Sequence, residues 1–138
     1  MKASDVAKYI LKNSSKRLSN LELQKTLYFA EVDFIKEHKK SLIDDNFEAW
    51  QFGPVVRDVY MEYRDYGANS IDVPDNQEKL DLSDAEKETI AKTIKQCNNK
   101  SYWDLVGETH REGGAWDKTY QKGQKKIIDK ELIRKEAK

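Results

Sequence analysis

Residues 19–35 carry the feature that most restricts how this chain can fold. Ser19 and Glu22 have the spacing of a capping box, in which each side chain accepts a hydrogen bond from an unpaired backbone N–H at the start of a helix. Apolar residues then recur at helical spacing in two adjacent stripes: Leu23, Leu27, Ala30 and Phe34, and Leu21, Tyr28 and Ile35. Because two stripes make a wide apolar face, we expect a central helix that several other helices contact.

Further helix starts follow along the chain. Ser83 begins a second capping box and Ser101 a third. Ser4 and Asp129 are candidate caps of the first and last helices. Gly53-Pro54 predicts another helix start, because proline at the first helical position lacks an N–H that would be unpaired there anyway.

The segment before that proline has no helical period. We expect an extended stretch near residues 46–52, with most of the area of Trp50 and Phe52 buried. No repeat or linker divides the 138 residues, which is the size of one ordinary domain. The sequence therefore predicts an all-α or mainly α fold: a single domain over residues 1–138 with about six or seven helices.

Charge is unevenly distributed although the formal net charge is zero. Residues 41–89 carry 4 basic and 13 acidic groups, whereas residues 118–138 carry 8 basic and 3 acidic groups. Such blocks either steer a charged partner or pair with each other on a solvated surface. The candidate partner-binding residues are carboxylates of the acidic stretch: Asp72, Asp75, Glu78, Asp81 and Glu86. The C-terminal lysines could contact nucleic acid, but the neutral chain has no DNA-binding motif, so we do not expect a nucleic-acid partner.

Few residues have a pattern typical of catalysis. Cys97, the one cysteine, falls on the apolar side of its predicted helix, where a thiol is usually inert. His110 is either a general base or a histidine that interacts with a helix C-terminus and packs against Trp116. We favour the second role, because no carboxylate or nucleophile is spaced to work with His110.

Neither a metal site nor a cofactor is expected, since the chain lacks metal-ligand spacings and phosphate-binding glycine loops. The N-terminal residues lack the apolar core of a signal peptide, and no apolar run reaches the length of a membrane span. We therefore expect a cytoplasmic protein with no membrane contact.

Three blocks of the sequence resemble a known family. The stretch LQKTLYFA at residues 23–30 is similar to the LQKLLYYA signature of the Panacea domain. The stretch EAWQFGPVV at residues 48–56 is similar to the central EAWxYGPVV motif of that family, with Phe52 where tyrosine is common. Thr109-His110 and Trp116 resemble its third block, although Gly113-Gly114-Ala115 replaces a shorter, proline-containing approach to the tryptophan.

The Panacea family comprises SocA-like antitoxins and phage-associated GepA-like proteins, so the resemblance implies a helical, non-enzymatic domain. Its members neutralise a cognate toxin, usually encoded beside them, by direct protein contact. The resemblance leaves two alternatives open: an adaptor that delivers a toxin to a Clp-type protease, and a phage-encoded protein that acts against a host defence toxin. The residues that the resemblance marks as motif and scaffold are Leu23, Lys25, Leu27, Tyr28, Trp50, Gly53, Pro54, Val55, Tyr60, His110 and Trp116.

Overall fold

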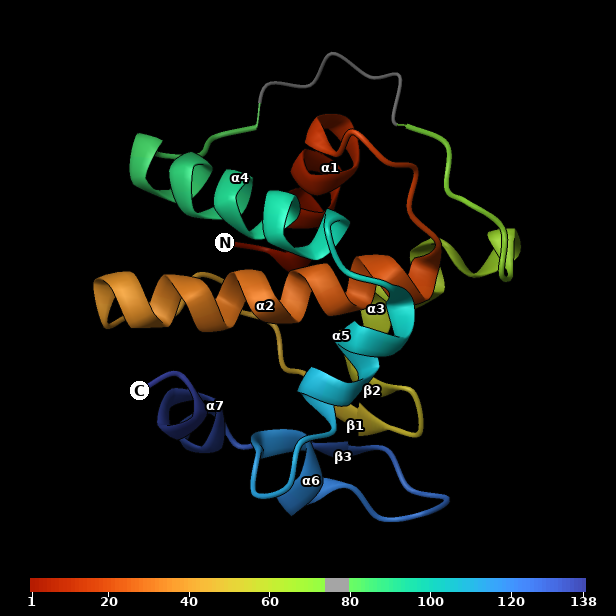
Figure 1. Ribbon diagram of the computed structural model, residues 1–138, viewed down its shortest axis with the longest axis vertical. Coiled ribbons are helices and arrows are strands. Elements are labelled where there is room, and N and C mark those ends of the chain that lie inside the picture. The colour runs from red at the N-terminus through yellow and green to blue at the C-terminus, as the bar shows by residue number, and fades with distance from the viewer. Residues whose placement is uncertain (74–79) are drawn as a thin grey trace.

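The computed structural model describes residues 1–73 and 80–138, and it is mainly α-helical, as predicted (Figure 1). Its elements are α1 (Ala3–Asn13), α2 (Asn20–His38), β1 (Glu48–Trp50), β2 (Gly53–Val55), α3 (Arg57–Glu62), the 3-10 helix η1 (Arg64–Tyr66), α4 (Asp84–Asn98), α5 (Tyr102–Thr109), α6 (Ala115–Thr119), β3 (Lys126–Ile127) and α7 (Lys130–Glu136). The predicted number of helices is confirmed for the described residues, and β1 lies within the predicted extended segment.

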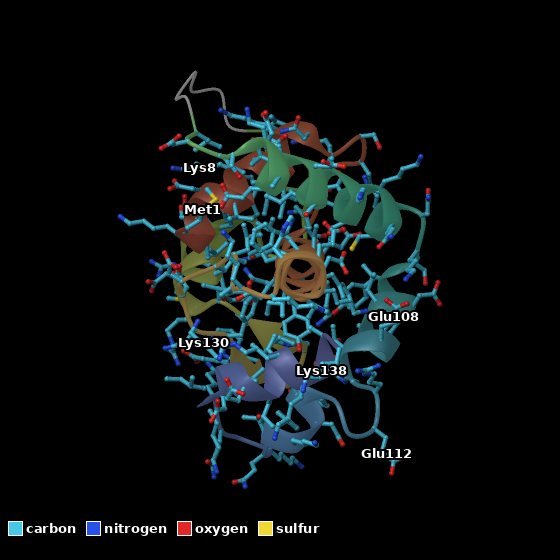
Figure 2. All side chains as sticks on the ribbon, turned by 90° about the vertical axis from the view of Figure 1, so that its left-hand side faces the viewer. Met1, Lys8, Glu108, Glu112, Lys130 and Lys138 are labelled. Atoms are coloured by element: carbon cyan, nitrogen blue, oxygen red, sulfur yellow. The ribbon has the colours of Figure 1, made fainter. Side chains whose placement is uncertain are left out.

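The helix α2 occupies the middle of the molecule, as its two apolar stripes predict. Figure 1 shows α1 and α4 on one side of α2, and the sheet, α6 and α7 on the other. In Figure 2, which looks along α2, side chains surround this helix on all sides. Leu23, Leu27 and Tyr28 are fully buried. Burial of an apolar side chain of this size stabilises the folded state by roughly 1.5–3 kcal/mol. Among the described helices, none combines the length and apolar character that a membrane crossing requires.

Four of the predicted helix starts are confirmed. The hydroxyl groups of Ser19, Ser83 and Ser101 each accept a hydrogen bond from the third residue of the helix, and the capping box is complete in all three. Asp129 caps α7 by accepting a hydrogen bond from the Glu131 N–H at 2.8 Å. These caps involve residues close in sequence, so spacing alone identifies them.

The predicted cap at Ser4 is wrong. The helix α1 begins one residue earlier, and the Ala3 N–H donates to the Asp45 carboxylate at 2.8 Å. Ser4 lies inside the helix, where its hydroxyl donates to Glu62 at 2.9 Å. A carboxylate from a distant loop thus replaces the local cap, and sequence spacing carries no signal of it.

The prediction that Gly53-Pro54 starts a helix is also wrong. Both residues lie in β2, which pairs antiparallel with β1 so that Trp50 faces Gly53 and Ala49 faces Pro54. The strand β3 pairs with the other side of β1, which leaves β2 at an edge of the sheet. Proline is tolerated in an edge strand because no further strand requires its missing N–H. The helix α3 begins only at Arg57.

The C-terminal helix α7 is held against α2 and α6 by Glu136. This carboxylate accepts hydrogen bonds from the Tyr28 hydroxyl and from the Ala115 N–H, the latter at 3.1 Å, and it lies 3.6 Å from Arg111. Contact with Glu136 and burial together raise the pKa of Tyr28 well above its usual range, with burial the larger cause. The end of the basic C-terminal segment is therefore tied to the body of the domain through α7.

We predict that Glu136→Ala lowers the free energy of unfolding by about 2–4 kcal/mol. The change leaves the buried Tyr28 hydroxyl and the Ala115 N–H without an acceptor, and each unsatisfied buried group costs about 1–3 kcal/mol. The control is Glu131→Ala on the same helix, whose exposed side chain pairs with Arg134. Urea denaturation measures both variants, and equal stability of the two would contradict the anchoring role of Glu136.

Candidate functional site

Lys25 of α2 lies at the point where the three motif blocks meet. Its side chain is 1% exposed, and its Nζ donates a hydrogen bond to the carbonyl oxygen of Phe52 in the turn between β1 and β2. Burial lowers the pKa of Lys25 to about 8, because desolvation disfavours the charged amine. A buried amine needs a hydrogen-bond acceptor, so this contact restricts where the turn can lie on α2.

Gly53 packs directly against the Lys25 amine. Its φ angle is 117°, a conformation that residues with a side chain rarely adopt. A Cβ atom at this position would collide with Lys25 Nζ and would lie 3.4 Å from His110 Nε2. Glycine is therefore required both by the backbone conformation and by the space that Lys25 fills.

Three stacked rings lie beside Gly53. The His110 ring stacks on Trp116 with centroids 3.7 Å apart, and Trp116 stacks on Tyr120 at 4.6 Å. The Trp116 Nε1–H donates to the carbonyl oxygen of Trp50 at 2.7 Å, which ties α6 to β1. His110 is the C-cap residue of α5, as expected, and the favoured expectation that it packs against Trp116 is confirmed.

The environment of His110 favours the neutral ring. Burial, followed by the positive charge of Lys25, lowers the pKa of His110, while the nearby Phe52 carbonyl acts in the opposite direction. The Nε2 atom is buried and makes no hydrogen bond with any described residue. The half-buried ring therefore packs on Trp116 in its neutral form, and it also borders the surface groove described below.

Trp50 links the sheet to α3. Its Nε1–H donates to Glu48 at 3.0 Å, and Arg57 makes two 2.9 Å hydrogen bonds to the same carboxylate. Partial burial acts against the charged form of Glu48, but the hydrogen bonds from Arg57 and Trp50 hold its pKa below the usual value.

The Trp50 ring also makes two contacts of its own. It meets the Tyr60 ring edge-on, with the centroids 4.9 Å apart, and the Lys125 ammonium lies 4.3 Å from the Trp50 centroid. Five further motif residues are buried around these contacts: Leu23, Leu27, Tyr28, Pro54 and Val55.

Cys97 has the properties of a core thiol, as expected. It is buried on α4, and burial raises the pKa of its thiol to about 11. A nucleophilic cysteine needs the opposite shift. In the described part of the chain, no group of histidine, cysteine and carboxylate side chains is arranged to hold a metal ion.

An apolar groove opens at the surface beside this buried site. The groove has a volume of about 450 Å³, and its walls include Leu21, Phe52, Tyr102, Trp103 and Val106. The expected burial of Phe52 is wrong: its backbone carbonyl faces Lys25, but its side chain is 45% exposed because it lies at the tip of the turn. Trp103 is 76% exposed. The groove therefore offers aromatic surface to a partner.

Three of the predicted acidic residues, Asp72, Asp81 and Glu86, are not among the groove's wall residues. Asp72 pairs with Arg17, Asp81 is exposed, and Glu86 completes the capping box of α4. Asp75 and Glu78 lie outside the described residues. A docking role for these carboxylates stays a prediction.

Comparison with known families is consistent with this geometry. The family model "Antitoxin SocA-like, Panacea domain" matches residues 23–117. The chain belongs to the SocA-like Panacea family. The matched range contains Lys25, the turn at Phe52-Gly53, His110 and Trp116, so the buried site lies within the Panacea domain. That the domain spans all of residues 1–138 stays a prediction.

One curated relative is named Antitoxin SocA and comes from Caulobacter vibrioides (strain NA1000 / CB15N). It is 32% identical over 110 residues, and the alignment covers 72% of this chain and 58% of that protein. The chain thus matches rather more than half the length of this relative. No solved structure matches the chain.

Sequence reasoning missed several residues that hold the Panacea site together. Gln24 is fully buried, donates to Asn20 at 3.1 Å and accepts from the Val56 N–H at 3.0 Å. A glutamine at an inward position of α2 was the available signal, because a buried amide needs a partner. The exposure of Trp103, two residues after the predicted cap Ser101, was also missed, because helical spacing alone does not indicate it.

We predict that Gly53→Ala destabilises the Panacea domain by more than about 3 kcal/mol. Backbone strain alone costs about 1–3 kcal/mol, and the new methyl group also meets the enclosed Lys25 amine. Gly107→Ala is the matched control, because Gly107 lies in α5 with no neighbouring atom within 4 Å and should gain about 0.5–1 kcal/mol. Thermal denaturation decides the matter, and a Gly53→Ala protein as stable as wild type would refute the proposed packing.

We also predict that Lys25 makes stability depend on pH. Below pH 8 the buried amine is charged in both states, and folding carries the full cost of its desolvation. Between about 8 and its ordinary value of 10.5, the unfolded chain binds a proton that the folded chain does not, so stability rises with pH. The gain over this window is on the order of 3 kcal/mol.

The matched variant for this measurement is Lys25→Met, an unbranched side chain one atom shorter that cannot titrate. The difference in unfolding free energy between wild type and variant should move in favour of wild type as the pH rises from 7 to 10. Ionisation of tyrosines and of Cys97 affects both proteins and cancels in the difference. Parallel pH profiles for the two proteins would show that Lys25 is not titrating in a buried site.

Proposed function

We propose that this protein is the antitoxin of a toxin–antitoxin system and neutralises a cognate toxin by direct binding. The observation that carries the proposal is membership of the SocA-like Panacea family. The relative named Antitoxin SocA supports it. On this proposal the protein acts by occupying a surface of the toxin and needs no catalytic activity of its own.

The physical properties of the motif agree with a binding module. Of its chemically distinctive groups, Lys25 is fully buried and His110 is half-buried with its Nε2 atom covered, and both contact the scaffold. By contrast, the exposed side chains of Phe52 and Trp103 have no evident role in folding. Exposed aromatic residues of this kind are enriched in protein–protein interfaces.

The proposal predicts that the protein restores growth to cells that express its toxin. The product of the neighbouring gene should arrest growth when induced alone, and co-expression of this protein should remove the arrest. A tag on the toxin should then co-purify both proteins. Gly53→Ala serves as a destabilised control that should give weaker protection. A neighbouring product that is harmless alone and does not co-purify would contradict the proposal.

Variations of the co-expression experiment test the two alternatives, the protease adaptor and the protein that acts against a host defence toxin. If the complex forms but protection disappears in a strain without the Clp-type protease, the protein acts as an adaptor that delivers the toxin. If protection is directed at a toxin encoded elsewhere in the host genome, the role against a host defence is favoured.

A further inference from the structure

The helix α5 separates two hollows of opposite character. Trp103 contributes to the walls of both the apolar groove and a second, larger hollow of about 800 Å³. This indole is 76% exposed, the highest value among the large apolar side chains that the structure describes. Trp103 therefore forms a ridge between the two hollows. Its exposed indole contributes little to the core.

The apolar groove differs from the rest of this highly charged chain. Its described walls contain no aspartate, glutamate, lysine or arginine, although these residues make up 36% of the sequence. Phe52 and Trp103 are 51 positions apart in sequence, and the fold places both in this groove. A charged ligand has no counterpart there, whereas an aliphatic or aromatic side chain would bury apolar area on both sides.

The hollow on the other side of Trp103 is lined by charges of both signs. Its acidic residues are Asp33, Asp104, Glu108 and Glu136, and its basic residues are Lys36, Lys100 and Arg111. Lys100 lies 2.6 Å from Glu108, and Glu108 lies on the outer side of α5 in Figure 2. Four carboxylates make this hollow unsuitable for a nucleic-acid backbone, while a peptide with acidic and basic side chains complements it.

We propose that the α5 ridge, defined as Trp103 with the two hollows beside it, docks an amphipathic segment of the toxin. The apolar face of that segment lies in the groove beside Phe52 and Trp103, and its charged edge, with side chains of both signs, lies over the acidic and basic residues of the second hollow. This inference rests on the proposed antitoxin function. Trp103 has the position of an interface hot spot, because an exposed tryptophan that enters a partner's pocket carries a large share of binding energy.

The test compares exposed apolar residues on and off the ridge. Phe52→Ala and Trp103→Ala should each weaken toxin binding at least tenfold and abolish protection from the toxin, while both proteins keep wild-type thermal stability. Met61→Ala on α3 and Ile127→Ala on β3 are matched controls, since these side chains are 44% and 59% exposed away from α5. Isothermal titration with purified toxin gives the affinities, and co-expression gives the protection.

A second measurement does not depend on the toxin. Peptides selected from a displayed random library on the immobilised full-length protein should be amphipathic, and they should lose at least tenfold in affinity for Trp103→Ala but not for Ile127→Ala. Selected peptides that bind Trp103→Ala as tightly as wild type would overturn the proposal. So would a wild-type homodimer that Trp103→Ala dissociates, since a second copy of the chain would then occupy the ridge.

The results distinguish the ridge from the antitoxin function. If Trp103→Ala still protects cells from a toxin that wild type neutralises, the function stands and the ridge is wrong. If no toxin is neutralised but the selected peptides bind at Trp103, the ridge stands and the proposed function is wrong.

Discussion

The hydrogen bond from the buried Lys25 amine to the Phe52 carbonyl is the contact on which the rest of the structure depends. It holds the turn between β1 and β2 against the central helix, and Gly53 must follow it because no side chain fits beside the amine. The same turn places the Trp50 carbonyl where Trp116 donates to it. Trp116 in turn stacks on His110, so the end of α5 is positioned by the same chain of contacts.

Phe52 joins the scaffold to the surface. Its carbonyl oxygen faces inward to Lys25, and its side chain faces outward beside α5. The hydrogen bond to Lys25 holds the backbone at Phe52, and therefore the direction in which its side chain leaves the turn. A preorganised aromatic surface loses little conformational entropy when a partner binds it.

How much of this was predictable depends on the range of each interaction. The capping boxes at Ser19, Ser83 and Ser101 were predicted correctly, because donor and acceptor lie three residues apart. Gly53-Pro54 was misassigned, because the dipeptide fits both a helix start and an edge strand, and only pairing with β1 decides between them. The identity of the motif residues came from the family resemblance, but their physical roles did not.

The contacts of Lys25 lay beyond sequence reasoning for a related reason. Lysine is almost never fully buried, so residue type argues for exposure, and its acceptor is the backbone carbonyl of Phe52, which carries no sequence signature. The exposure of Phe52 was missed for a similar reason. The register of β1 and β2 places Phe52 at the tip of the turn, and the apolar run in which it lies does not reveal that register.

The most direct test is a measurement of the pKa of Lys25 in the folded protein. The side-chain Cε signals of lysine, observed by NMR across a pH titration and assigned through Lys25→Met, report each amine separately. A Lys25 midpoint near 8 is the result that a buried amine on the Phe52 carbonyl requires. A midpoint near the ordinary value of 10.5 would show that this amine is solvated and that the turn is held by something else.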